Sequence, residues 1–367
     1  MSAREAWVRV HLWLGLTLGL VGALVGITGS ILVFDTEIDG LLNPQRYAVS
    51  DVTHALPPSA YVEQAARAAP GSRISFLRMP DAAGMPVVAF AAARGEGGTP
   101  ARVFLDPLSA RVVDVSATGG LVAWVHGLHE NLRLRVQHGR EVVGAVGIAM
   151  LVSSLTGICL WWPGGRRFAA SLGFRRGLPL TRNLHYTFGF YGCVLLAMLS
   201  FTGIFIAFND AGRAVVGAVL PVSAPVREVP AAESEQRARR IGVDEAVAIA
   251  AARHPGTKLW NVRMPAGARG AYRVNLSEPG EDAFQPGRGS VVFVSAAGEI
   301  LRDVDAGSRT SGDAFLGALR TLHSGDALGL AGRVAICAAG LLPALFVVTG
   351  SVMWLRRRGA STTAPAR

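Results

Sequence analysis

The sequence predicts a membrane α-helical fold: four transmembrane helices in two parallel repeats, with a small external α+β unit in each repeat. Three observations predict it. Uncharged apolar runs occupy residues 10–34, 142–162, 184–208 and 334–355, one histidine-containing pattern recurs in two of these runs, and the polar segments between the runs also repeat. Each run is long enough for a helix across a hydrocarbon core of about 30 Å.

The placement of arginines predicts the orientation of these helices. Arginines concentrate in the N-terminal tail, the loop between the second and third runs and the C-terminal tail: Arg4, Arg9, Arg166, Arg167, Arg175, Arg176, Arg182, Arg356, Arg357, Arg358 and Arg367. Because short cytoplasmic loops are rich in Arg and Lys, we expect these three segments to be cytoplasmic and both long connections to lie outside. The net charge of +10 therefore indicates topology and contact with anionic lipid, not nucleic-acid binding. The first run is longer than a signal-peptide core and no A-x-A site follows it closely, so we expect it to be retained.

The apolar runs repeat in pairs. The first and third share a pattern 174 residues apart: His11, Gly15, Thr28-Gly29 and Phe34 recur as His185, Gly189, Thr202-Gly203 and Phe208. The second and fourth share another: Gly139-Arg140, Thr156-Gly157 and Trp161 recur as Gly332-Arg333, Thr349-Gly350 and Trp354. Thr-Gly pairs suit close helix–helix approach, with the hydroxyl bonded to its own helix. Two halves in the same orientation imply a pseudo-two-fold axis along the membrane normal.

The external segments repeat at an offset of 185 residues, where Pro70-Gly71 and Arg78-Met79-Pro80 recur as Pro255-Gly256 and Arg263-Met264-Pro265. In each copy a short amphipathic helix is expected to end at Pro-Gly. Alternating apolar residues then predict strands at 73–79, 86–92 and 102–105 in the first copy and at 258–263, 271–276 and 290–294 in the second, each copy ending in a turn and a last strand.

These patterns divide the chain into consecutive segments. They are helix 1 (1–34), external unit 1 (35–118), an amphipathic His-containing segment (119–141), helix 2 (142–162), an Arg-rich cytoplasmic loop (163–183), helix 3 (184–208), external unit 2 (209–311), a second amphipathic His-containing segment (312–333), helix 4 (334–355) and a cytoplasmic tail (356–367).

Four of the eight histidines obey the repeat. His11 matches His185 at the cytoplasmic helix ends, and His129 matches His323 just before the outer ends of helices 2 and 4. His126 lies one turn before His129, on the same helix face. A single histidine near a membrane interface is usually a hydrogen-bonded side chain at the headgroup level, so the matched pairs carry more weight than any one residue. His54, His138 and His254 break the repeat. We expect His254 to end a helix and His138 to lie on the surface, with contact to a cofactor edge as the alternative.

The matched histidines suit a b-type haem. Such a haem needs neutral imidazoles on both sides of its iron, an apolar slot for the macrocycle and cations near its propionates. Both pairs have arginines nearby: Arg9 and Arg182 inside, Arg140 and Arg333 outside. Spacing alone does not separate haem from another metal, although the neighbouring sequence offers neither intramembrane carboxylates nor paired cysteines for zinc or di-iron.

These segments resemble the PepSY-associated transmembrane-helix proteins, and the external repeats resemble PepSY domains. The resemblance is carried by His11–Phe34, His129 with Gly139-Arg140 and Trp161-Trp162-Pro163, His185–Phe208, and Leu322-His323-Ser324-Gly325 through Arg356-Arg357. The family includes inner-membrane ferric-siderophore reductases that carry haem b. The resemblance implies a multi-pass protein of the bacterial inner membrane, with cytoplasmic termini, periplasmic PepSY-like units and haem b, most simply two, held by His11, His129, His185 and His323, with His126 a further match.

On this resemblance the expected function is electron transfer across the membrane to a ferric siderophore or another periplasmic ferric chelate. The donor would be a quinol or a separate flavoprotein. External arginines such as Arg73, Arg78, Arg263 and Arg273 could attract an anionic chelate, although scattered arginines are usually solvated. Two alternatives stay open: a non-catalytic PepSY membrane protein that binds or regulates a periplasmic peptide or protein, and an iron or siderophore permease, for which four helices offer few polar intramembrane groups.

Overall fold

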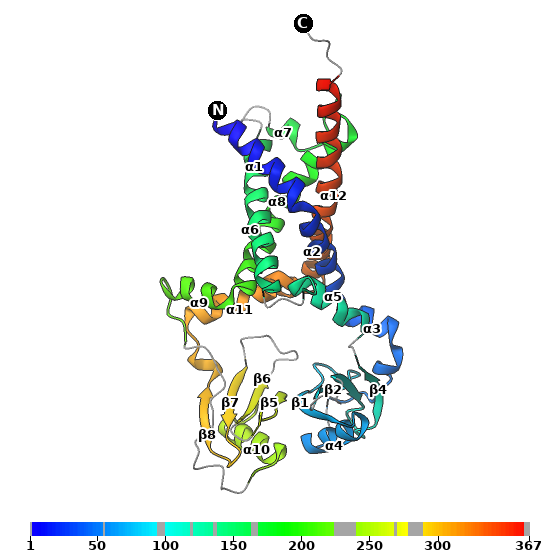
Figure 1. Ribbon diagram of the computed structural model, residues 1–367. Coiled ribbons are helices and arrows are strands. Elements are labelled where there is room, and N and C mark those ends of the chain that lie inside the picture. The colour runs from blue at the N-terminus through cyan, green and yellow to red at the C-terminus, as the bar shows by residue number, and fades with distance from the viewer. Residues whose placement is uncertain are drawn as a thin grey trace. The chain divides into compact units, whose positions relative to one another are not determined.

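The computed structural model describes residues 2–53, 56–93, 100–117, 120–134, 138–162, 168–223, 240–267, 270–277 and 289–362 of the 367-residue chain. The chain forms two compact units (Figure 1). The membrane unit comprises Met1–Asp35, Val125–Val219 and Ala318–Arg367. The sheet unit comprises Thr36–Trp124 and Leu220–Gly317.

Within the described residues, three helices of the membrane unit are long and apolar enough to cross a membrane: α6 (Gly139–Trp161), α8 (Leu180–Ala207) and α12 (Gly329–Thr362). A fourth crossing results if α1 (Ala3–Thr17) and α2 (Gly19–Leu32) act as one span, because this pair bends by 62°. The sequence predicted one helix there. Thr17 donates its hydroxyl hydrogen to the Trp13 carbonyl at 2.7 Å and Gly19 lies two residues further on, two features that favour a kink.

The two halves of the membrane unit interlock. α2 packs mainly against α12, and α6 packs mainly against α8 (Figure 1). At the first contact a Cβ on Gly26 would collide with the Gly340 carbonyl, and Ser30 donates to the Cys337 carbonyl at 2.8 Å. The first helix of each half therefore packs against the second helix of the other half, as small residues at membrane helix interfaces allow.

Short helices complete both units. They are α3 (Asp35–Leu42), η1 (Pro44–Tyr47), α5 (Gly120–Asn131), α7 (Phe168–Ser171), α9 (Asn209–Gly217), η5 (Ala306–Ser308), α11 (Ser311–Ser324) and η6 (Asp326–Leu328). α5 and α11 occupy the two segments predicted to be amphipathic. Each has a histidine in its last turn, His129 and His323 respectively.

The sheet unit contains one eight-stranded antiparallel sheet, in the order β4-β3-β2-β1-β5-β6-β7-β8. The strands are β1 (Ser72–Arg78), β2 (Val87–Ala93), β3 (Ala101–Leu105), β4 (Val112–Ser116), β5 (Lys258–Arg263), β6 (Tyr272–Ser277), β7 (Ser290–Val294) and β8 (Ile300–Val304). The strand positions predicted from the sequence are confirmed. The sequence predicted two separate α+β units, whereas here β1 pairs with β5, with Leu77 opposite Val262. This pairing satisfies the backbone groups of two edges that separate units would leave open.

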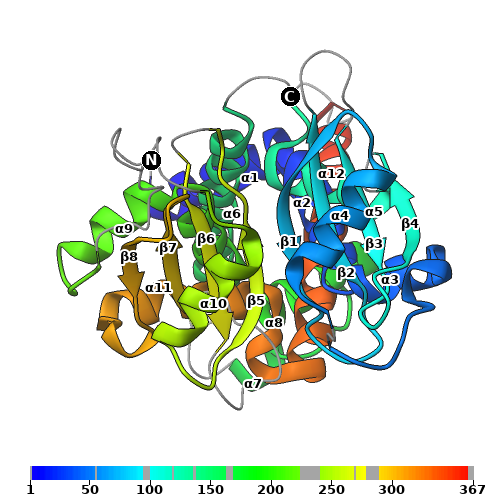
Figure 2. The same ribbon diagram turned by 90° about the horizontal axis from the view of Figure 1, so that it is seen from below.

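Two helices, α4 (Pro58–Ala68) and α10 (Val243–Arg253), cover one face of this sheet (Figure 2). Beneath them lies a core whose strand residues are fully buried, among them Leu77, Val103 and Val262. The backbone N–H of Ser59 donates to Asp244 at 2.8 Å, so the helices of the two repeats are also joined to each other.

Candidate functional site

The four repeated histidines meet in two pairs inside the membrane unit. The ring centres of His11 and His185, the first pair, lie 6.3 Å apart with the planes at 82°. Those of His129 and His323, the second pair, also lie 6.3 Å apart, with the planes at 52°. Each pair takes one histidine from each half of the chain.

In the first pair each ring is held by a threonine from a repeated Thr-Gly dipeptide. Nδ1 of His11 lies 3.1 Å from Oγ1 of Thr156 and 3.1 Å from the Ser153 carbonyl oxygen. Nδ1 of His185 lies 2.8 Å from Oγ1 of Thr349. The histidines come from α1 and α8, whereas the threonines come from α6 and α12.

The second pair repeats this arrangement with other helices. Nδ1 of His129 lies 2.9 Å from the Val25 carbonyl oxygen and 3.3 Å from Oγ1 of Thr28. Nδ1 of His323 lies 2.8 Å from Oγ1 of Thr202. Here α5 and α11 supply the histidines, and α2 and α8 supply the threonines.

These contacts determine the tautomer of all four rings. A carbonyl oxygen only accepts, so Nδ1 of His11 and of His129 must carry the hydrogen. The threonine hydroxyls already donate to the carbonyls one turn back, at 2.7–2.8 Å: Thr28 to Leu24, Thr156 to Val152, Thr202 to Met198 and Thr349 to Leu345. Each Oγ1 therefore accepts from Nδ1–H. In the neutral ring the lone pair then lies on Nε2, which no hydrogen bond engages in the part of the chain that the structure describes.

The glycine after each threonine makes room for the Cε1 edge of the ring. A Cβ built on the glycine would lie 2.9 Å from Cε1 for Gly29 and His129, 3.2 Å for Gly157 and His11, 3.2 Å for Gly203 and His323, and 3.6 Å for Gly350 and His185. The sequence predicts helix–helix approach at the Thr-Gly pairs, whereas in the structure they receive histidine rings. The equal number of repeated Thr-Gly pairs and repeated histidines was the signal for this role.

Glycines also leave space one turn after each histidine of the first pair. Gly15 follows His11 and Gly189 follows His185 by four residues, which places each on the same helix face as its histidine. A Cβ on either glycine would meet nothing within 4 Å. A large planar group beside the His11 and His185 rings would therefore find open space at Gly15 and Gly189.

The four predicted arginines lie in different surroundings. Arg333 donates from Nε at 3.0 Å and from a terminal nitrogen at 2.6 Å to the Val33 carbonyl oxygen, and its guanidinium lies 4.7 Å from the centre of the Phe34 ring. Since Val33 follows the last residue of α2, Arg333 caps that helix end. Arg9 and Arg140 are exposed, and Arg182 is half-buried in the first turn of α8.

The two other histidines near the pairs contact acidic side chains. Nε2 of His126 lies 3.4 Å from Asp35, and its Nδ1 lies 4.0 Å from Glu130. His138 is exposed and lies 3.6 Å from Glu141. His54 lies outside the described residues.

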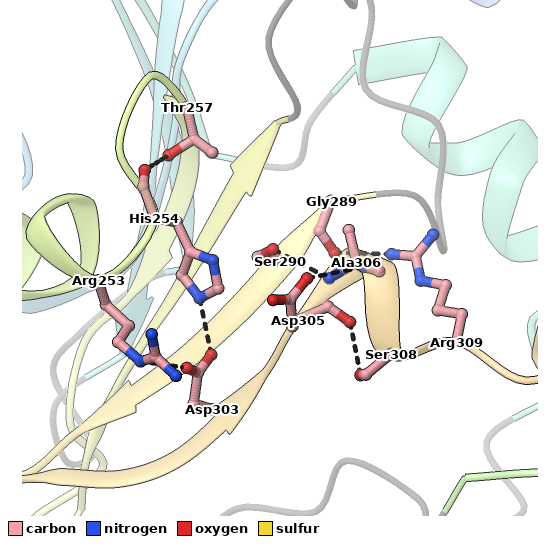
Figure 3. Close-up of polar contacts among 11 residues, drawn as sticks. Arg253, His254, Thr257, Gly289, Ser290, Asp303, Asp305, Ala306, Ser308 and Arg309 are labelled. Atoms are coloured by element: carbon pink, nitrogen blue, oxygen red, sulfur yellow. Dashed lines mark hydrogen bonds and ion pairs between the residues drawn. The ribbon is translucent and has the colours of Figure 1, made fainter.

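His254 has a structural role in the sheet unit (Figure 3). It follows the last residue of α10, as predicted, and its Nε2 lies 2.7 Å from one carboxylate oxygen of Asp303 on β8. Arg253 contacts the other oxygen at 2.7 Å, and Thr257 donates to the His254 carbonyl at 2.7 Å. These bonds attach the C-terminal end of α10 to an edge strand of the sheet.

The comparisons with known proteins cover both units. The model of the family described as "PepSY-associated TM region" matches residues 8–357. No curated protein matches the chain. Among the described residues, no group of three or more His, Cys, Asp or Glu side chains could hold a metal ion.

Proposed function

Because the chain belongs to the family of PepSY-associated TM regions, we propose that it is a transmembrane electron-transfer protein that binds haem b and reduces ferric chelates. His11 and His185 would hold one haem, and His129 and His323 a second. One observation carries the proposal: each half contributes one imidazole to each of two pairs, and every ring keeps Nε2 available.

The spacing within each pair would suit two imidazoles that hold one haem iron. Imidazoles bind metals at about 2.0 Å, and a ring centre lies roughly 1.1 Å behind its nitrogen, so two rings on one iron have centres about 6.2 Å apart. The observed separation is 6.3 Å in both pairs. A haem would need only two ligands from the protein, which each histidine pair would supply, whereas a tetrahedral zinc site needs four ligands.

The distance between the two pairs supports a path across the membrane. α8 carries His185 in its second turn and Thr202, which holds His323, near its other end. The 17 residues from 185 to 202 rise by about 25 Å, close to the hydrocarbon thickness of about 30 Å. The first pair lies at the end with Arg182, the start of α1 and the end of α12 (Figure 1), which the positive-inside bias assigns to the cytoplasm of a bacterial inner membrane.

In this proposal the bound haem supplies one-electron chemistry. The chain supplies the ligands, fixes their tautomer through threonine, and surrounds the pairs with apolar helices. A quinol or a separate flavoprotein gives up the electron, and the ferric ion of a periplasmic chelate accepts it. Chelators with hard oxygen donors hold Fe(II) more weakly than Fe(III), so reduction releases the metal.

Haem quantification tests the proposal directly. The full chain would be purified in detergent from haem-replete cells and measured as the pyridine haemochrome, with about two haems per chain expected. His185→Ala and His323→Ala should each remove about half of the reduced-minus-oxidised b-type absorbance. His138→Ala, which changes an exposed histidine, should remove none. A colourless preparation would contradict the proposal and favour the alternative, a PepSY membrane protein that binds a periplasmic peptide or protein partner.

A further inference from the structure

A single row of side chains crosses seven strands of the sheet. Each member lies directly opposite the next in the strand register, from β3 through β2, β1, β5, β6 and β7 to β8. The row is Arg102, Phe90, Phe76, Arg263, Arg273, Phe293 and Arg302. Because directly opposed residues point to the same side of a sheet, all seven belong to one face.

This face is not the one that the helices cover. Leu77 follows Phe76 on β1, and Val262 precedes Arg263 on β5. Both Leu77 and Val262 are fully buried in the core beneath α4 and α10. Successive strand residues alternate between faces. The row therefore lies on the face opposite α4 and α10, which we call the arginine face.

The arginines of the row lie over its aromatic rings. The distances from guanidinium carbon to ring centre are 5.2, 5.6 and 5.9 Å for Arg102 over Phe90, Arg263 over Phe76 and Arg273 over Phe293. Phe76 and Phe90 meet edge to face, with centres 5.3 Å apart. On β3, β2, β1 and β5 the row thus places two rings between two cations. Arg263 is exposed there, and Arg102, Phe90 and Phe76 are half-buried.

Positive charge concentrates along the row. Arg263 lies directly opposite Arg273, and like charges at such positions destabilise strand pairing. The row contains four arginines and no acidic residue. The row therefore gives this face a positive field that favours anions.

We propose that the arginine face binds an anionic ligand that carries planar aromatic rings. Guanidinium groups pair with oxygen anions in a bidentate manner and stack on aromatic faces, and the Phe76–Phe90 pair offers further ring contacts. This inference rests on the proposed function, for which it names the substrate class: ferric chelates of the catecholate type, whose donor oxygens sit on aromatic rings and whose complexes are anionic.

Binding of gallium(III) tris-catecholate, a redox-inert trianion, tests the inference by calorimetry on the full chain. Replacing Arg102 and Arg263 together by glutamine should weaken binding at least about tenfold, the size of one charge-assisted hydrogen bond. Arg67→Gln is the matched control, because Arg67 lies on α4, is exposed and pairs only loosely with Glu63 at 3.9 Å. It should leave binding within about twofold.

A second variant separates recognition of the rings from recognition of charge. Phe76→Leu keeps an apolar side chain but removes the ring, so it should weaken gallium tris-catecholate binding and leave binding of gallium citrate, an anion without rings, unchanged. Equal effects on both probes would overturn the aromatic part of the inference. Equal binding by the parent protein and the double arginine variant, or binding of anionic lipid vesicles in place of the catecholate, would overturn the site.

Binding of gallium tris-catecholate should not depend on whether haem is present. Gallium is not reduced, so the probe should bind equally to the parent protein and to the His185→Ala and His323→Ala variants. Catecholate binding that depends on the arginines in a colourless protein would support the ligand site while the proposed electron transfer failed. A red protein whose catecholate binding ignores both arginines would retain the proposed function and contradict this inference.

Discussion

Thr202 accepts a hydrogen bond from Nδ1 of His323 at 2.8 Å while its own hydroxyl hydrogen goes to the Met198 carbonyl, also at 2.8 Å. Thr349 and His185 are related in the same way. Histidines that bind metals usually donate their other ring N–H to a carboxylate, a carbonyl or water. A threonine hydroxyl gives the same control of the tautomer without placing an ionised group in the membrane, where charge is costly.

Removing that hydroxyl should weaken haem binding at the second pair. Thr202→Val keeps the size of the side chain but removes the hydroxyl oxygen that accepts from Nδ1–H of His323. Loss of such a supporting bond typically costs about 10–100-fold in metal affinity. Haem titration of the purified protein measures the affinity, and electron paramagnetic resonance of the ferric form should show a shifted low-spin signal.

Two further variants control for this change. Thr202→Ser retains the hydroxyl and should behave like the parent protein. Thr321→Val removes a hydroxyl from α11 that bonds only its own helix, at the Ala318 carbonyl, and should leave the affinity and the signal unchanged. A normal signal in Thr202→Val would show that the threonine does not position His323.

The glycines beside the rings allow a graded prediction. Alanine at Gly29, Gly203 or Gly350 would place its Cβ 2.9, 3.2 or 3.6 Å from a histidine Cε1. We expect the loss of haem after gel filtration to be largest for Gly29→Ala, smaller for Gly203→Ala and small for Gly350→Ala. Alanine favours helix by about 1 kcal/mol over glycine, so general helix weakening cannot produce this order. Equal haem content in all three variants would contradict the assigned role of the glycines.

The strands and the helix ends could be predicted from the sequence because they depend on patterns of neighbouring residues. Alternation of apolar residues located the strands, and Pro-Gly located the ends of α4 and α10. The matched positions of His11 and His185 predicted their proximity, since a site shared by two parallel repeats takes equivalent residues from both. The ring separation of 6.3 Å agrees with that expectation.

The remaining features depend on contacts between distant segments. Nothing in β1 or β5 alone indicates that Leu77 pairs with Val262, because an edge strand and an interior strand can have the same alternation. Arg333 has the position expected of a propionate partner but binds the Val33 carbonyl, an acceptor that exists only because α2 ends there. The bend between α1 and α2 lacks a proline, the usual sign of a break.

Asp106 should make the sheet unit sensitive to acid. Burial raises the pKa of this carboxyl group, but hydrogen bonds from the backbone of Ser50 and from the hydroxyl and backbone of Ser109 outweigh burial and hold the pKa well below its usual range. Since the folded pKa lies below the unfolded value of about 3.9, the stabilisation is fully present above that value and is lost as the pH falls through the folded pKa.

Thermal unfolding followed by tryptophan fluorescence measures this contribution. Asp106→Asn should lower the free energy of unfolding by about 1–3 kcal/mol near neutral pH, and the difference from the parent protein should shrink as the pH falls below about 4. The exposed Asp51 provides the control, because Asp51→Asn should change little at any pH. A difference between the parent and Asp106→Asn proteins that stays constant with pH would show that ionisation of Asp106 does not stabilise the fold.

Substitutions that break the ion pairs of Arg46 should lower the free energy of unfolding of the sheet unit. Its side chain is 5% exposed and joins Asp39 at 2.7 Å to Asp114 at 2.6 Å, linking α3 and η1 to the edge strand β4. Breaking a fully buried ion pair costs about 3–5 kcal/mol. Asp114 is 22% exposed and Asp39 still neutralises the arginine, so Asp114→Asn should cost less, about 1–3 kcal/mol.

The pair Arg67–Glu63 supplies the comparison, because both side chains are exposed and 3.9 Å apart. Glu63→Gln should change the free energy of unfolding by less than about 0.5 kcal/mol. Replacing Asp39 and Asp114 together should cost more than the sum of the single changes, since only the double variant leaves the buried guanidinium without a carboxylate. Additive effects, or equal effects of Asp114→Asn and Glu63→Gln in thermal unfolding, would mean that solvent already screens the charge of Arg46.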